Sequence, residues 1–172
     1  MKYFAYGSNM CTARLKKRVP SAKFLVVASL KGHDLKLNKK GKDGSGKCNI
    51  QRTNDTGKVV MGVVFEMDPN DKPALDRAEG LGHGYSEKNV KVSSQHEKRE
   101  IEAFTYQAQD SFIDNALKPY DWYKEFVVAG GKEHTFPDSY VKRLERVEAV
   151  KDPDKCRAEK NRKILKSCNQ DL

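Results

Sequence analysis

Apolar runs and alternating apolar and polar positions predict the strands of this chain. The strongest signal is residues 59–65, where Val-Val-Met-Gly-Val-Val-Phe is apolar on both faces and rich in β-branched side chains. Residues 2–6 form a short aromatic strand that ends at a Gly-Ser-Asn turn. The other predicted strands cover residues 24–28 with a continuation through Leu35 and Leu37, residues 87–93 and residues 99–107.

Helices are predicted where apolar residues recur every three to four positions next to turn residues. Asp68-Pro69-Asn70 opens a helix that carries Leu75 on its apolar side. Further helices are predicted at residues 12–18, after Pro119, around residues 136–147 and at residues 154–167. Residues 38–57 are rich in Gly, Lys and Asn, and we expect them to form a mobile surface loop.

Early strands followed by late helices predict an α+β protein. The length of 172 residues suits about one domain. We place the folded core in residues 1–150 and treat residues 151–172 as a basic C-terminal tail, helical or partly disordered. Because the tail holds little apolar material, we expect it to be dispensable for chemistry.

The net charge of +9 is concentrated in two segments. Residues 31–58 hold eight Lys and Arg against three acids, and residues 142–166 hold ten against five. Such charge suits nucleic acid, solubility or an anionic substrate. No RNA-binding aromatic signature or zinc-finger spacing accompanies it, so we expect nucleic acid not to be the main partner.

The remaining motifs disfavour several other functions. The sequence has no apolar run of membrane-spanning length and no secretory signal, so we expect a cytoplasmic protein. The four cysteines lack metal-ligand spacing, and we expect them to be reduced. Residues 41–48 are similar to a phosphate-binding loop, but Cys48 replaces the required Ser or Thr and no helical pattern follows. We therefore expect no metal and no cofactor.

Two motifs carry candidate chemistry. The strand at residues 3–6 runs straight into a turn, where successive backbone N–H groups can bind an anion, and Gly7 leaves that backbone accessible. Glu79 ends a predicted helix and is followed by three glycines in five residues, so its carboxylate can project into a cleft. On these residues alone, an ordinary strand end and a solvated glutamate are equally good interpretations.

Taken together, the two motifs resemble those of the γ-glutamylcyclotransferase family. Residues 6–9 (Tyr-Gly-Ser-Asn) are similar to its N-terminal motif. Residues 75–80 (Leu-Asp-Arg-Ala-Glu-Gly), followed by Gly84-Tyr85, are similar to its second motif. The likeness extends over about residues 3–148. The glutathione-specific relatives differ at the first motif, where they have Leu in place of Asn9.

The resemblance implies a small mixed β-barrel or sheet with peripheral helices, and an acyltransferase or lyase of glutathione metabolism that needs no cofactor. In this family the α-amine of a γ-glutamyl substrate attacks its own γ-carbonyl and releases 5-oxoproline. The resemblance implies Glu79 as the general acid and base. It also implies a set of substrate-binding residues: Tyr3, Phe4, Ala5, Tyr6, Gly7, Ser8 and Tyr123. Tyr120 is the alternative to Tyr123.

Several points stay open at this level. The leaving group is an amino acid or another amine, and the place of Tyr85 relative to the site is undecided. The sequence does not decide the oligomeric state, although a homodimer is compatible with the family. The alternative function is a non-catalytic binding protein of the same fold, which would use its basic segments on nucleic acid or a protein partner.

Overall fold

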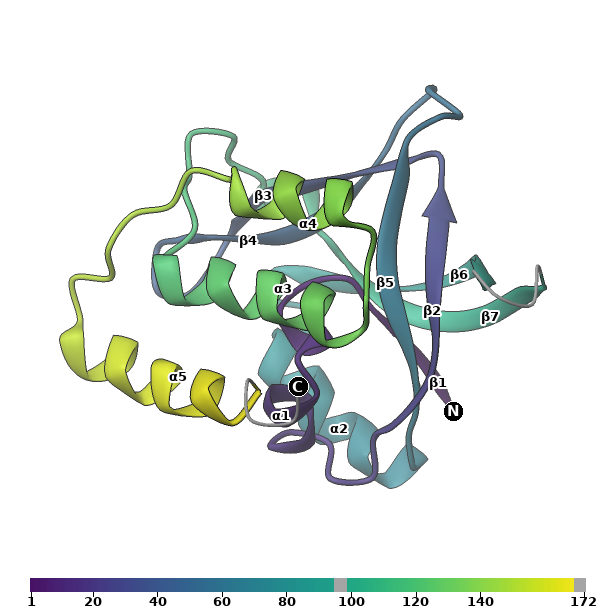
Figure 1. Ribbon diagram of the computed structural model, residues 1–172, viewed down its shortest axis with the longest axis horizontal. Helices are drawn as coiled ribbons and strands as arrows, with labels where there is room; N and C mark the ends of the chain where they lie inside the picture. Colours follow the sequence, from purple (N-terminus) through teal and green to yellow (C-terminus); the bar gives the residue numbers. More distant parts are fainter. Residues whose placement is uncertain (95–98, 169–172) are drawn as a thin grey trace.

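The strand with the strongest sequence signal, β5 (Val59–Glu66), belongs to a closed barrel in the computed structural model, which describes residues 1–94 and 99–168 (Figure 1). It pairs antiparallel with β1 (Lys2–Ala5) on one side and with β2 (Lys23–Lys31) on the other. Residues 60–65 are all buried, which explains why this strand is apolar throughout rather than alternating.

Two more strands close the barrel. β6 (Tyr85–Ser94) pairs antiparallel with β2 and with β7 (Glu100–Ala108). A parallel contact between Tyr3 and Phe104 then joins β7 to β1. The predicted α+β class is confirmed, and the barrel order is β1-β5-β2-β6-β7.

The expectation of a mobile loop at residues 38–57 is wrong. β3 (His33–Lys40) and β4 (Gly46–Arg52) form a two-stranded antiparallel sheet beside the barrel. Its two asparagines are buried and satisfied: Asn49 donates to Asn38 (3.3 Å) and accepts from the Ala108 N–H (3.0 Å). Because composition does not show whether amides satisfy one another, a buried hairpin was read as a solvated loop.

Helices α3, α4 and α5 follow the last barrel strand in the chain and lie together on one side of the barrel, whereas α1 and α2 connect barrel strands (Figure 1). α3 is amphipathic and buries Trp122, Tyr123 and Phe126. The helices and 3-10 turns are η1 (Ser8–Met10), α1 (Thr12–Lys16), η2 (Pro69–Asp71), α2 (Lys72–Glu79), η3 (Asp110–Phe112), α3 (Asp121–Glu133), α4 (Asp138–Glu145) and α5 (Lys155–Cys168).

The predicted polar helix at residues 154–167 is present as α5, and it packs against α1 and α3. Arg162 forms an ion pair with Asp121 at 2.7 Å, and Ala158 is buried. Asn161 accepts a hydrogen bond from Arg14 at 3.0 Å. Residues 151–168 therefore lie against the barrel domain.

Two further findings concern the cysteines and the membrane. Cys48 and Cys156 are free thiols, and Cys48 is buried. Cys11 takes part in a disulfide, so the expectation that all four thiols are reduced is wrong for this residue.

Within the described residues, no helix combines the length and apolar character needed to cross a membrane.

Candidate active site

Glu79 is the last residue of α2, and the way this helix ends directs its side chain. Gly80 adopts a left-handed conformation with φ of +71°, which favours glycine. The N–H groups of Gly80 and Leu81 both donate to the Asp76 carbonyl, at 2.9 and 3.0 Å. This cap stops the helix and leaves Glu79 facing the turn that follows β1.

The Glu79 carboxylate is held through only one of its two oxygens. Asn9 Nδ2 donates to Oε1 at 2.9 Å, and Arg18 Nη1 donates to the same oxygen at 2.7 Å. Oε2 has no hydrogen-bond partner in the part of the chain that the structure describes. The side chain is 17% exposed. The remaining oxygen is thus available to a ligand.

Asn9 connects Glu79 to the N-terminal motif. Its amide also donates to the Tyr3 hydroxyl at 3.0 Å, and its carbonyl oxygen accepts from Arg18 at 2.9 Å. Both N–H protons and the oxygen of this buried amide are therefore used. The network fixes Tyr3, Arg18 and Glu79 relative to one another.

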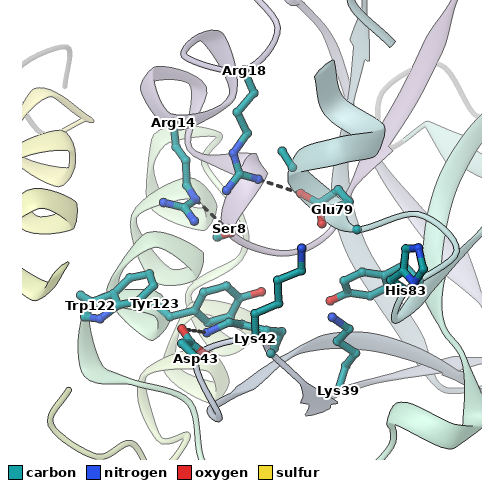
Figure 2. A pocket seen from close by; sticks show the side chains of 15 residues that line it. Ser8, Arg14, Arg18, Lys39, Lys42, Asp43, Glu79, His83, Trp122 and Tyr123 are labelled. Carbon is teal, nitrogen blue, oxygen red and sulfur yellow. Dashed lines mark hydrogen bonds and ion pairs between the residues drawn. The ribbon is translucent and has the colours of Figure 1, made fainter. Parts of the chain in front are cut away.

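Two adjoining cavities meet at Glu79, and they share Ser8, Tyr85 and Tyr123 in their linings. The inner cavity has a volume of about 30 Å³ and is lined mainly by tyrosines. The outer cavity has a volume of about 240 Å³ and is lined mainly by charged side chains. Figure 2 shows Arg14 and Arg18 on one side of the outer cavity, with Lys39 and Lys42 on the other.

The tyrosine hydroxyls of the inner cavity differ in how their protons are used. Tyr6 donates to the Tyr106 carbonyl and Tyr85 donates to the Cys48 carbonyl. Tyr3 and Tyr123 instead accept, from Asn9 Nδ2 and from the Cys48 N–H (3.0 Å). The bond from Asn9 leaves the proton of Tyr3 to donate elsewhere, whereas the Tyr123 hydroxyl also lies within hydrogen-bonding reach of the Cys48 thiol, with which a ligand would compete for its proton.

Burial keeps the tyrosine hydroxyls and the Cys48 thiol around this cavity protonated. It raises the pKa of the phenols of Tyr3, Tyr6, Tyr85 and Tyr123 above the ordinary value. It also raises the pKa of the Cys48 thiol to about 12. All of these groups are neutral at physiological pH, so the inner cavity offers hydrogen-bond donors without negative charge. A thiol held in this form is a poor nucleophile.

Glycine at position 7 relieves a tight contact as well as leaving the backbone accessible. A Cβ at this position would lie 3.0 Å from the Cβ of Cys48 and 3.4 Å from the Tyr123 hydroxyl. Gly7 has φ of −122°, so no left-handed backbone is involved. Ser8 opens the η1 turn, and its N–H has no acceptor within that turn.

The structure brings most of the predicted site residues together. Tyr3, Tyr6, Gly7, Ser8, Glu79 and Tyr123 all line the inner cavity, and Tyr85 lines both cavities. Phe4 and Ala5 are fully buried in β1 and lie outside both linings. The alternative, Tyr120, donates to the Asp43 carbonyl at 3.0 Å.

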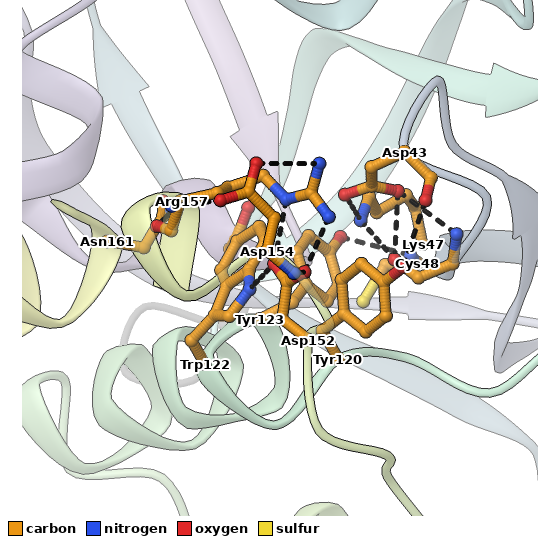
Figure 3. Close-up of polar contacts among 12 residues, drawn as sticks. Asp43, Lys47, Cys48, Tyr120, Trp122, Tyr123, Asp152, Asp154, Arg157 and Asn161 are labelled. Atoms are coloured by element: carbon orange, nitrogen blue, oxygen red, sulfur yellow. Dashed lines mark hydrogen bonds and ion pairs between the residues drawn. The ribbon is translucent and has the colours of Figure 1, made fainter. Parts of the chain in front are cut away.

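Sequence reasoning missed the cationic side chains of the site. Residues 14 and 18 belong to the helix predicted at residues 12–18, which was given no role in the site, and residues 39, 42 and 47 belong to the predicted loop. The segment at residues 41–48 is not a phosphate-binding loop, because it turns between two strands and precedes no helix. In Figure 3, Lys47 is held by Asp43 at the tip of this hairpin.

Comparisons with known proteins agree with this arrangement. The model of the AIG2-like family matches residues 59–144. The γ-glutamylcyclotransferase of Bos taurus is 36% identical over 152 residues, which cover 85% of this chain and 78% of the bovine protein, and that of Homo sapiens is 35% identical with the same coverage. A solved structure named gamma-glutamyl cyclotransferase is 31% identical with a TM-score of 0.86, over 97% of this chain and 98% of that one.

These likenesses identify an enzyme, and they do not favour a non-catalytic binding protein of the same fold. They extend over most of this chain and of each relative. The chain belongs to the γ-glutamylcyclotransferase family.

Proposed function

We propose that this enzyme converts γ-glutamyl-amino acids or γ-glutamyl amines to 5-oxoproline and a free amine, with Glu79 as general acid and base. The observation that carries the proposal is the position of Glu79 Oε2. Glu79 lines both cavities where they meet, and Asn9 and Arg18 hold Oε1 while Oε2 keeps no hydrogen-bond partner among the described residues. A proton acceptor held in one orientation at a cavity junction suits acid–base catalysis.

The reaction needs one proton acceptor that later becomes a donor. The substrate binds with its α-ammonium group against Glu79, and the carboxylate takes one proton from it, which frees the lone pair of the amine. The nitrogen then bonds to the γ-carbonyl carbon, which closes a five-membered ring and gives a tetrahedral intermediate. Glu79 returns its proton to the leaving nitrogen as the old C–N bond breaks, and a second proton passes from the ring nitrogen to the leaving amine, so that a neutral lactam and an ammonium group are the products. Folding the substrate into this shape supplies much of the rate acceleration.

The inner cavity supplies donors for the intermediate. Its volume of about 30 Å³ suits one small polar group rather than a whole side chain. Donors aimed at the developing oxyanion lower the barrier most where water is excluded. The hydroxyls of Tyr3 and Tyr123 and the N–H of Ser8 are the groups we assign to this role. The rest of the substrate then occupies the outer cavity.

The other attributes of the family are proposed here on the same grounds. We place the reaction in γ-glutamyl and glutathione metabolism, because that is where γ-glutamyl amides arise. A cytoplasmic location and a homodimeric state stay predictions.

The test is to measure 5-oxoproline release from a panel of γ-glutamyl dipeptides, γ-glutamyl amines and glutathione. We expect release from at least one dipeptide, with the free amine formed in equal amount. Absence of 5-oxoproline with every member of the panel, from protein that is folded by thermal melting, would overturn the proposal.

A further inference from the structure

The outer cavity carries more positive charge than its own acids neutralise. Its lining holds five cations and two carboxylates: Arg14, Arg18, Lys39, Lys42 and Lys47, with Asp43 and Glu79. Arg18 is paired with Glu79 and Lys47 with Asp43, each at 2.7 Å. Three cations are left over.

The three remaining cations have no carboxylate partner among residues 1–94 and 99–167. Arg14 is held by neutral groups only, the Ser8 hydroxyl at 3.1 Å and the Asn161 carbonyl oxygen at 3.0 Å. Lys42 is exposed at the hairpin turn. Figure 2 shows Lys42 and Lys39 extending from the hairpin toward Glu79.

Lys39 is the most informative of the three. It is only 5% exposed, and its ammonium lies 4.4 Å from the centre of the Tyr85 ring. A Cβ at Gly84 would lie 2.7 Å from Nζ, so glycine there leaves room for the ammonium group. Burial lowers the pKa of Lys39. The carboxylates of Glu79 and Asp43 act on Lys39 only from beyond ion-pair distance, and a buried cation without a direct partner is costly unless a ligand supplies one.

The number of unpaired cations indicates the charge of the ligand. A γ-glutamyl derivative of a neutral amino acid brings two carboxylates, one on each half, and its ammonium group faces Glu79. An acidic leaving amino acid adds a third carboxylate on its side chain. Counted with its ammonium group, the acidic derivative carries a net charge of −2 and the neutral derivative −1, against an excess of +3 in the cavity lining (five cations less two carboxylates). The acidic derivative therefore neutralises more of that excess.

We propose that the preferred leaving group is an acidic amino acid, aspartate or glutamate, whose side-chain carboxylate is bound by Lys39 and Lys42. This inference rests on the proposed function, because it names the substrate class of the same site. Charge complementarity of this kind gives selectivity between ligands of equal shape. Lys39 and Lys42 are then specificity-determining residues.

The test compares γ-glutamyl-glutamate with γ-glutamyl-glutamine, which have nearly the same shape and differ by one charge. We expect kcat/KM of the full chain to be about tenfold higher for the glutamate compound. Lys42→Met and Lys39→Met should each lower kcat/KM for the glutamate compound much more than for the glutamine compound, so that most of the preference is lost. The matched control is Lys40→Met, which removes the same charge from an exposed position of β3 outside the cavity lining.

The outcomes separate the two proposals. Equal kcat/KM for the two compounds in the wild-type enzyme would overturn the inference and leave the proposed function intact. An undiminished preference in Lys42→Met would overturn the assignment to the lysines, and this exposed site keeps the test valid if Lys39→Met fails to fold. No release from either compound or from γ-glutamyl-alanine would overturn the proposed function, and the inference with it.

Discussion

At the scale of single residues, Glu79 is the group on which the chemistry depends. We predict that Glu79→Gln lowers kcat by about 10²-fold or more, because the amide keeps the volume but cannot carry the proton. Substrate binding and the thermal midpoint should change little. Steady-state kinetics and thermal melting on the same preparation measure both. A variant with most of the wild-type rate would remove Glu79 from the mechanism and direct attention to Glu66, Glu87 and Glu102.

Asn9 is a positioning residue in this site. Its amide holds Tyr3, Glu79 and Arg18 at once. We predict that Asn9→Leu lowers kcat by about 10- to 100-fold and changes the pH dependence of kcat, because Glu79 loses a hydrogen-bond donor. The pH–rate profile is the measurement, since a purely structural role would leave its shape unchanged. An unaltered profile with a lower thermal midpoint would show that Asn9 serves folding alone.

Substitution of Gly7 tests whether the turn after β1 contributes to substrate binding. We predict that Gly7→Ala raises KM more than Ser8→Ala does, because a Cβ would press on Cys48 and Tyr123 in the inner cavity. Adding Cys48→Gly to Gly7→Ala should restore part of the affinity if contact with the Cys48 side chain is the cause. Normal KM and kcat in Gly7→Ala would contradict the assignment of this turn to substrate binding.

At the scale of elements, α5 is attached to α3 by a buried acid. The Asp152 side chain is fully buried, accepts from Trp122 Nε1 at 2.7 Å and is paired with Arg157 (Figure 3). Arg157 holds the pKa of the Asp152 carboxyl at about 2, below the value of about 3.9 in an unfolded chain. The attachment therefore stabilises the fold above about pH 4, and this contribution is lost as the pH falls from about 4 to about 2.

We predict that wild-type protein loses about 2 kcal/mol of unfolding free energy over that pH range through this group. Asp152→Asn should be less stable at neutral pH and should lack this part of the acid-induced loss. The matched control is Asp110→Asn, an exposed aspartate without an ion pair in the described part of the chain. Denaturant unfolding from pH 2 to pH 6 gives the curves. Parallel curves for wild type and Asp152→Asn would refute the prediction.

At the scale of the whole molecule, residues 151–172 bear on the stability of the fold and on substrate binding. Sequence alone predicts that removal of residues 151–172 leaves the chemistry intact. The contacts favour a different result, because Asn161 holds Arg14 and Asp152 holds Trp122, and both of these partners line the outer cavity.

We predict that truncation after Val150 lowers the thermal midpoint by several degrees and raises KM, with a smaller effect on kcat. Thermal melting and kinetics with a neutral γ-glutamyl dipeptide check this expectation. A truncated enzyme with an unchanged midpoint and unchanged KM would show that residues 151–172 are a separate appendage, as the sequence alone suggests.

Local sequence patterns were enough to predict several secondary-structure elements of this protein. The apolar run at residues 59–65 predicted the buried strand β5, and the glycines after residue 79 predicted a helix that ends at Glu79. The turn at residues 6–9 was also recognisable. These features depend on side chains that lie near one another in the sequence, so periodicity and turn residues are enough to find them.

Only the tertiary structure decided which polar residues belong to the site. Arg14 and Arg18 stood in a predicted helix and Lys39 in a predicted loop, and the tertiary structure brings all three to one cavity with Glu79. The strand around Leu35 and Leu37 was predicted, but its partner β4 was taken for a loop because polar side chains of the two strands are buried against each other. A charge or amide has the same sequence pattern on the surface and inside, and burial depends on partners far along the chain.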